Sequence, residues 1–257
     1  MNENLRPNRV KKFREGCIYK TNQYGDLIIL QYESATKVRV RFLETGYETT
    51  TSMPNIVASK VKDLFAKTVY GVGVVGEKVS KINGEYPKEY ILWRNMLKRC
   101  YDKSTISANK TYEGCSVSEE FKFYHYFKWW CRNQIGFDQE GWQLDKDILN
   151  PQSKRYSPEH CVFVPVELNS LTKWNKTITE ESLIGVKYNK QLGKFYANIT
   201  SEGVKKHLGV FNTRLETFLV YKEAKELAMK KAAEKWKDQI DPRVYEALMN
   251  YQVEITD

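Results

Sequence analysis

The first part of the chain, from Cys17 to about Val75, reads as strands, because apolar and polar residues alternate along it. The alternating segments read CIYKTN, DLIILQY, KVRVRFLE and YETTTS, and Tyr24-Gly25-Asp26 and Glu44-Thr45-Gly46 supply turns. A period of two is typical of half-buried strands, and glycine favours tight turns. The pattern predicts four short strands that form a small barrel or meander.

The third of these segments places three cations on one face of a strand, because Lys37, Arg39 and Arg41 are spaced by two residues. Such a row is either a solvated outer face or a stripe that contacts phosphate groups. We favour the solvated face, because charged side chains on a strand usually point into water.

Helical spacing replaces the alternation further along the chain. It predicts one helix over 89–99 and a second over about 118–133. The apolar positions that carry these predictions are Tyr90, Leu92, Trp93, Met96 and Leu97 in the first, and Phe121, Phe123, Phe127 and Trp130 in the second.

Between these regions, Gly71, Gly73 and Gly76 match G-x-G-x-x-G by letter. The dinucleotide-binding motif needs a helix that opens at its last glycine. Here Asn83-Gly84 and Pro87 break any such helix early. We therefore expect no nucleotide site at this segment.

Three strand-like pieces lie between Gly185 and Phe211, split at Gly193 and at Glu202-Gly203. A polar stretch at 177–182 precedes them and is expected to be a linker. A helix is expected from Thr213 to Trp236, and a short one after Asp241-Pro242. The residues expected to share one face of the longer helix are Phe218, Tyr221, Ala224, Leu227, Ala228 and Ala232.

Composition adds a charge argument. The net charge is +9, and residues 185–237 hold 12 Lys and Arg against 5 Asp and Glu, which is a formal +7 in one small module. Lysine and arginine bind polyanions because they neutralise phosphates and release counterions. The chain has no apolar run near the roughly 18–20 residues of a membrane span, and residues 1–20 lack a signal-peptide core. We expect a cytoplasmic protein without membrane contact.

The five cysteines are widely spaced, with no C-x-x-C pair. This argues against a disulfide framework and against a zinc knuckle. A metal site on Cys100, Cys115 and Cys131 is conceivable, but we favour buried thiols.

The module at 185–236 carries GVKY at 185–188, GKFYANI at 193–199, HLGVF at 207–211 and YKEA at 221–224. In these residues it resembles the AP2-type DNA-binding domain. The resemblance implies a three-stranded sheet that enters the major groove of DNA. Outward strand positions are then the expected contacts: Lys187, Tyr188, Lys194, Tyr196, Asn198, Lys205 and Lys206. The lysines would position the backbone, and Asn198 would read a base edge.

The stretch LDKDILNPQSKRYSPEHCVFVPVELNSL, residues 144–171, has the layout of a ββα nuclease core. With Trp93, Met96 and Arg99-Cys100-Tyr101 upstream, it resembles the HNH-type proteins of phages and mobile elements, many of which are homing endonucleases with an AP2-like domain. Such cores hold a magnesium-class ion on a carboxylate and a histidine or asparagine, and a histidine activates water. Here Lys146 stands at the ligand position and Asp147 at the base position. The two later positions fall near His160 and at Asn169.

Two interpretations of this core stay open. In one, Asp147 and Asn169 hold Mg²⁺, Asp145 assists, and His160 or a water network supplies the base. In the other, the core keeps its fold and phosphate affinity but has lost efficient cutting. We favour the second, because Lys146 beside Asp147 makes that carboxylate a poorer base.

The sequence thus predicts an α+β protein with a β-rich domain at 1–80, an HNH-like ββα core with flanking helices at 84–175, an AP2-like sheet plus helix at 183–237 and a tail at 238–257. We expect sequence-specific binding of double-stranded DNA, with no cofactor needed for binding, as in a repressor in a bacterial host cell. The alternatives are a Mg²⁺-dependent endonuclease or nickase of the same family, and an RNA-binding or structural phage protein. The oligomeric state stays open.

Overall fold

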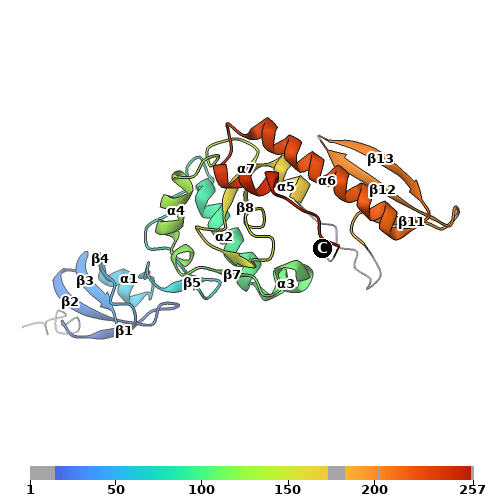
Figure 1. Cartoon of the computed structure of the whole chain (residues 1–257). Coiled ribbons are helices and arrows are strands. Elements are labelled where there is room, and N and C mark those ends of the chain that lie inside the picture. Colours follow the sequence, from blue (N-terminus) through green and yellow to red (C-terminus); the bar gives the residue numbers. More distant parts are fainter. Residues whose placement is uncertain (1–14, 173–182, 202, 256–257) are drawn as a thin grey trace, which may run out of the picture. The chain divides into compact units, whose positions relative to one another are not determined.

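The computed structural model describes residues 15–172, 183–201 and 203–255 and shows a mixed α+β protein with several small sheets (Figure 1). This confirms the expected class. Two compact units are present: residues up to 113 together with 119–128, and 114–118 together with those from 129 onward. The expected linker at 177–182 and the turn residue Glu202 lie outside the described residues.

The first unit opens with a four-stranded antiparallel sheet whose strands follow chain order. The sequence predicted either a small barrel or a meander, and the sheet is a meander. Its apolar residues alternate inward, so that Val38, Val40 and Phe42 are buried beside Met53 and Ile56. The elements of this part are β1 (Ile18–Lys20), β2 (Asp26–Ser34), β3 (Lys37–Phe42), β4 (Glu48–Thr51) and α1 (Met53–Val57). The expectation of strands up to about Val75 is wrong at α1, whose Met53 and Ile56 pack against the sheet.

The rest of the first unit is mainly helical. The helix expected over 89–99 is α2 (Lys88–Tyr101), followed by α3 (Lys103–Ala108) and a 3-10 turn at Lys110–Tyr112. The helix expected over 118–133 is shorter: a 3-10 turn at Glu120–Lys122 precedes α4 (Tyr124–Arg132). The interruption has a backbone cause, since Phe123 is extended and forms a parallel bridge with Val74.

The glycine-rich segment forms part of a two-stranded sheet, β5 (Lys67–Val69) with β6 (Gly73–Val74). No helix opens at Gly76, because the backbone stays irregular up to Pro87. A Cβ atom on Gly73 would lie 2.5 Å from a Leu97 carbon and 3.0 Å from Trp93. The glycine is therefore needed for close packing of β6 on α2, and the segment lacks the helix that the dinucleotide motif requires.

In the second unit, β8 (Trp142–Asp145) pairs with β10 (Val162–Pro165) in antiparallel fashion, and α5 (Val166–Thr172) follows at once. This is the strand–strand–helix order that the sequence predicted. Val162, Val164 and Leu168 of β10 and α5 are buried. A short parallel pair, β7 (Ser116–Val117) with β9 (Arg155–Tyr156), lies in the same unit.

A three-stranded antiparallel sheet follows, in chain order. Its strands are β11 (Val186–Asn189), β12 (Lys194–Ser201) and β13 (Val204–Phe211), and α6 (Arg214–Trp236) comes next. Thr213 begins α6 with a capping box, because its hydroxyl accepts from the Glu216 amide while the Glu216 carboxylate accepts from the Thr213 amide. The first part of α6 packs on one face of the sheet, where a Cβ on Gly185 would overlap the Tyr221 ring.

Helix α6 then continues into the core around β8, β10 and α5 (Figure 1). Met229, Ala232 and Ala233 are buried there beside α7 (Pro242–Met249), the short helix expected after Asp241-Pro242. Leu227, expected on the buried face, is instead 52% exposed. The buried stripe runs through positions 225, 229 and 232, so position 227 faces away from it.

The second unit therefore joins the ββα element and the three-stranded sheet through a single shared helix. The Lys225 ammonium, buried on α6, donates to the carbonyl of Leu171 in the last turn of α5. A cation at the C-terminal end of a helix is favourable because it meets the unsatisfied carbonyls. Among the helices in the described ranges, none combines the length and the apolar character needed to cross a membrane.

Candidate nucleic-acid interface

The three-stranded sheet has one face against α6 and one face open. Ala197 and Ile199 of β12 are buried on the helix side, so Tyr196, Asn198 and Thr200 point the other way. Residues paired across an antiparallel sheet share a face. The register extends the open side to Lys187, Val210, His207, Lys205 and Lys194, and we call these eight residues together the outer sheet face.

The register divides the residues expected to contact DNA. Lys187, Lys194, Tyr196, Asn198 and Lys205 share the outer sheet face. Tyr188 lies opposite Phe195, and Lys206 lies opposite Ile199, so both belong to the side on which α6 packs. The Tyr188 ring contacts the Phe195 ring at a centroid distance of 5.0 Å, although Tyr188 remains 54% exposed.

The sheet and its connecting loops carry mostly positive charge. From Leu183 to Phe211 the sequence has five lysines, and its one acidic residue is Glu202. In the part of the chain that the structure describes, Lys187, Lys194 and Lys205 have no carboxylate partner. Their side chains are exposed. Three cations on one open face, without neutralising neighbours, form a surface that attracts polyanions.

A polar pair sits between these lysines. Asn198 Oδ1 lies 2.9 Å from His207 Nδ1 across the β12–β13 pairing. The Tyr196 ring is 6.2 Å from the His207 ring, tilted by 42°. An irregularity in the register between Ala197 and Asn198 adds one residue to β13 at this point, and bulges of this kind re-aim side chains. His207 was not among the residues expected from sequence, because the bulge sets its face.

The loop between β11 and β12 is held by local bonds. Asn189 Oδ1 accepts from the backbone amides of Gln191 and Leu192, and Gly193 has a φ of +62°. An Asx turn of this kind fixes the loop without help from other elements. Its exposed Lys190 adds a cation beside the outer sheet face that the sequence reasoning missed.

The acidic cluster of the ββα element is organised by backbone bonds. Asp145, 8% exposed at the end of β8, accepts from the amides of Asp147 at 2.9 Å and Ile148 at 2.7 Å through Oδ1. Burial raises the pKa of Asp145 above its ordinary value, although these amide bonds act in the opposite direction. The carboxylate therefore holds the turn that follows the strand.

The next two residues form an ion pair. The Lys146 ammonium, 9% exposed, contacts the Asp147 carboxylate and donates to the Ser153 carbonyl at 3.2 Å. It also lies 5.6 Å from the centre of the Tyr156 ring. Asp147 itself is about half exposed. A lysine paired with Asp147 therefore stands at the position where the resemblance implied a metal ligand.

The two remaining candidates have partners of their own. His160 Nδ1 lies 2.9 Å from Ser153 Oγ, so contacts through Lys146 and Ser153 connect Asp147 to His160. Asn169, 7% exposed on α5, donates from Nδ2 to Gln143 Oε1 at 2.6 Å. The structure therefore connects the two catalytic candidates but gives Asn169 a different partner.

These residues do not fit a magnesium site. One Asp145 oxygen accepts from backbone amides and Asp147 is paired with an ammonium, while Asn169 is bonded to Gln143 through Nδ2 and keeps only Oδ1 as an oxygen ligand. Magnesium needs several oxygen ligands in near-octahedral order. Over residues 15–172, 183–201 and 203–255 no group of three His, Cys, Asp or Glu side chains is placed to hold a metal.

Four of the five cysteines, Cys100, Cys115, Cys131 and Cys161, are buried. Burial raises the thiol pKa of Cys115 and of Cys161. Metals bind the thiolate, so these two thiols are poor ligands. The expectation of buried thiols is confirmed.

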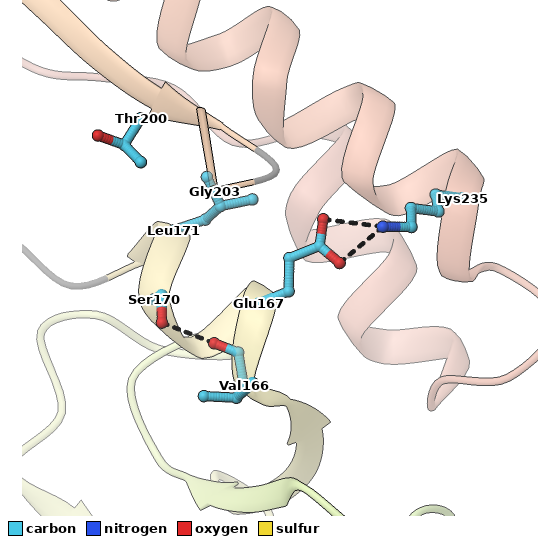
Figure 2. Close-up of a pocket in the computed structure, with 7 residues that line it drawn as sticks. All are labelled: Val166, Glu167, Ser170, Leu171, Thr200, Gly203 and Lys235. Carbon is cyan, nitrogen blue, oxygen red and sulfur yellow. Dashed lines mark hydrogen bonds and ion pairs between the residues drawn. The ribbon is translucent and has the colours of Figure 1, made fainter. Parts of the chain in front are cut away.

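A pocket of about 440 Å³ lies between α5, the tip of the β12–β13 hairpin and α6. Figure 2 shows the residues that line it. Its charged groups face each other: Lys235 Nζ lies 2.7 Å from Glu167 Oε2, and Ser170 Oγ donates to the Val166 carbonyl. These polar groups already satisfy one another, so the pocket offers little to a small ligand.

The cations of β3 have a different setting. Lys37 pairs with Glu33 at 2.6 Å, and Arg41 with Glu48 at 2.6 Å. Arg39 lies between Gln31 and Thr50. Two of the three charges are neutralised on the strand surface, which favours the solvated face over a phosphate-contacting stripe.

Comparison with known proteins gives no relative. No family model matches the chain, and searches of curated proteins and of solved structures find no significant similarity.

Proposed function

We propose that this chain is a sequence-specific binder of double-stranded DNA that uses the outer sheet face. The observation that carries the proposal is the set Lys187, Lys194 and Lys205, exposed and without carboxylate partners, on one face of a helix-backed sheet. A sheet of this kind fits the major groove of B-DNA, which is about 12 Å wide. The AP2-like residues at 185–224 support the same reading.

The face combines the two kinds of contact that specific binding needs. Lysines bind phosphates and set orientation without reading sequence. Asn198 lies between them and presents a polar group of the type that reads base edges. Three phosphate contacts contribute about −3 to the slope of log affinity against log salt.

The ββα element acts as a support in this proposal. Its Lys146–Asp147 pair is internally neutralised, and its connection to α6 through Lys225 and the shared core fixes it relative to the sheet. A chain of this design regulates by occupying its site, most simply as a transcriptional repressor that needs no cofactor to bind.

A second candidate is a Mg²⁺-dependent endonuclease or nickase. One observation favours it: Asp147 stays half exposed and is connected through Lys146 and Ser153 to His160. Against it stands the poor fit of Asp145, Asp147 and Asn169 to a metal.

Binding and cutting are tested separately. Anisotropy titrations compare a random duplex, a duplex enriched from a random library and single-stranded RNA of the same length. We expect the enriched duplex to bind at least about 100-fold more tightly than the random one. Equal affinity for all duplexes, or tighter binding of RNA, contradicts the proposal.

Cutting is measured on supercoiled plasmid that carries the enriched site, with Mg²⁺ or Mn²⁺. The binder proposal predicts intact plasmid for the wild-type chain and for Asp147→Ala. Nicking that disappears in Asp147→Ala and persists in Glu159→Gln, a matched carboxylate change next to His160, favours the nuclease.

A further inference from the structure

We propose that His207 fixes the Asn198 amide as a hydrogen-bond donor, so that the outer sheet face selects a keto base, guanine or thymine, at one position of its site. The inference rests on the proposed DNA binding and names the base chemistry that this surface reads. It begins from the 2.9 Å contact between Asn198 Oδ1 and His207 Nδ1.

The direction of this bond follows from chemistry. An amide oxygen has no hydrogen and only accepts, so His207 Nδ1 carries the proton and donates. His207 thus acts on Asn198 by donating to its amide oxygen.

The surroundings keep the pair in place. Asn198 and His207 are direct cross-strand partners beside the bulge, and the His207 ring rests near the Tyr196 ring at 6.2 Å. Asn198 is half buried, which limits the rotation of its side chain. Among the described residues, its Nδ2 group has no hydrogen-bond partner.

The Asn198 amide would therefore contact a base mainly through its donor side. Asparagine usually reads adenine with both ends of its amide, the oxygen accepting from N6 and the nitrogen donating to N7. Here one lone pair of the oxygen accepts from His207, which fixes the orientation of the amide and leaves the two N–H groups of Nδ2 to meet the bases. Guanine offers O6 and N7 as acceptors in the major groove, and thymine offers O4, whereas cytosine offers a donor and adenine sets its N6 donor beside its N7 acceptor.

The test enriches binding sites from a random duplex library at about pH 8, which keeps imidazole groups neutral. The wild-type chain is compared with Asn198→Ala, His207→Ala, His207→Phe and His207→Asn. Asn198→Ala identifies the position read by this side chain, because preference disappears there alone. We expect guanine or thymine to be favoured about tenfold at that position by the wild-type chain.

The His207 variants test the positioning role. His207→Ala and His207→Phe free the amide oxygen, so adenine joins the accepted bases at that one position, while the remaining positions and the salt dependence stay unchanged. His207→Asn puts a donor near the place of Nδ1 and restores the keto preference. Lys206→Ala, on the opposite side of β13, is the matched control and changes no base preference.

The outcomes separate the two proposals. A wild-type preference for adenine or cytosine at the Asn198 position overturns the inference, and so does a wild-type preference retained in both His207→Ala and His207→Phe. If the wild-type chain enriches no motif at all, the DNA-binding proposal itself fails.

Discussion

Strand β3 in the first unit carries three cations at alternate positions, and the sheet β11–β13 in the second carries one outward cation on each strand, but the neighbours of these cations differ. On β3, Glu33 and Glu48 reach Lys37 and Arg41 at 2.6 Å. On the outer sheet face, Lys187, Lys194 and Lys205 have neutral cross-strand partners, and the described strands around them hold no carboxylate.

The difference shows that a row of basic residues in a strand does not by itself indicate a polyanion site. An ion pair on the surface already satisfies the charge, and its attraction for a distant phosphate is screened within about 10 Å in 0.1 M salt. A cation whose cross-strand partners are neutral has no adjacent negative charge to offset its attraction for a phosphate. The cross-strand register therefore decides which of two similar strands is a candidate interface.

Reversing the outer cations gives the largest expected effect. The triple variant Lys187→Glu, Lys194→Glu, Lys205→Glu should bind DNA at least about 1000-fold more weakly, because each lost phosphate contact costs about tenfold at low salt. The slope of log affinity against log salt should decrease in magnitude by about 3. Anisotropy titrations from about 50 to about 200 mM salt measure both.

The matched control reverses the β3 row with Lys37→Glu, Arg39→Glu and Arg41→Glu. We expect less than about threefold loss of DNA affinity for this variant. An equal loss in both variants would mean that net charge alone governs binding, and the distinction between paired and unpaired cations would fail.

Much of the framework of this comparison was accessible from sequence. Alternation in KVRVRFLE predicts β3 and its outer cations, and the glycine-punctuated stretch 185–211 predicts three strands, because apolar periodicity reflects which side is buried. The order strand–strand–helix at 142–172 was also read correctly. These features depend on local pattern, which one sequence contains in full.

The parts that were not predicted depend on contacts between distant residues. The bulge beside Asn198 places His207 on the outer sheet face, and cross-strand pairing puts Lys206 on the other side. The contact of Lys146 with the Ser153 carbonyl and the burial of Lys225 arise when loops and helices pack. No periodicity along the chain specifies them, since a one-residue shift in register reverses every face.

Lys225, which is buried on α6, contrasts with the exposed lysines of the outer sheet face. Burial lowers the pKa of Lys225 to about 8, below its ordinary 10.5, so the folded chain binds fewer protons than the unfolded chain between these values. The cost of the buried charge is fully present below about pH 8 and is relieved as the pH rises toward 10.5. From about pH 7.5 to about pH 9.5 this group should raise the free energy of unfolding by about 2 kcal/mol.

Urea titrations at the two pH values measure this change, and Lys225→Met removes the titrating group while keeping the chain length. The difference between wild type and variant isolates Lys225 from other groups that titrate in this range. DNA affinity near neutral pH should stay within about twofold for Lys225→Met. The interpretation that the buried Lys225 affects folding and not DNA binding would be contradicted by either of two results. One is a difference in free energy of unfolding between wild type and Lys225→Met that does not change with pH, and the other is a large loss of DNA affinity.

Two adjacent lysines test the register itself. Lys205 lies opposite Thr200 on the outer sheet face, and Lys206 lies opposite Ile199 on the other side. We expect Lys205→Ala to lower DNA affinity about five- to tenfold and to reduce the salt slope by about 0.9, as for one phosphate contact. Lys206→Ala should change affinity less than about twofold. The reverse order of effects would place the interface on the α6 side.

Removing the acids from the first sheet gives the smallest expected effect. Glu33→Gln with Glu48→Gln leaves Lys37 and Arg41 without their carboxylates, so β3 then presents three unpaired cations as the outer sheet face does. Exposed ion pairs contribute about 0.2–1 kcal/mol each, so unfolding in urea should shift little. DNA affinity should rise by no more than about threefold, and equally for all sequences, because β3 offers new phosphate contacts without a base-reading group beside them. A gain in DNA affinity that depends on sequence would show that β3 reads bases as well. The two sheets would then differ only in whether their cations are paired with carboxylates.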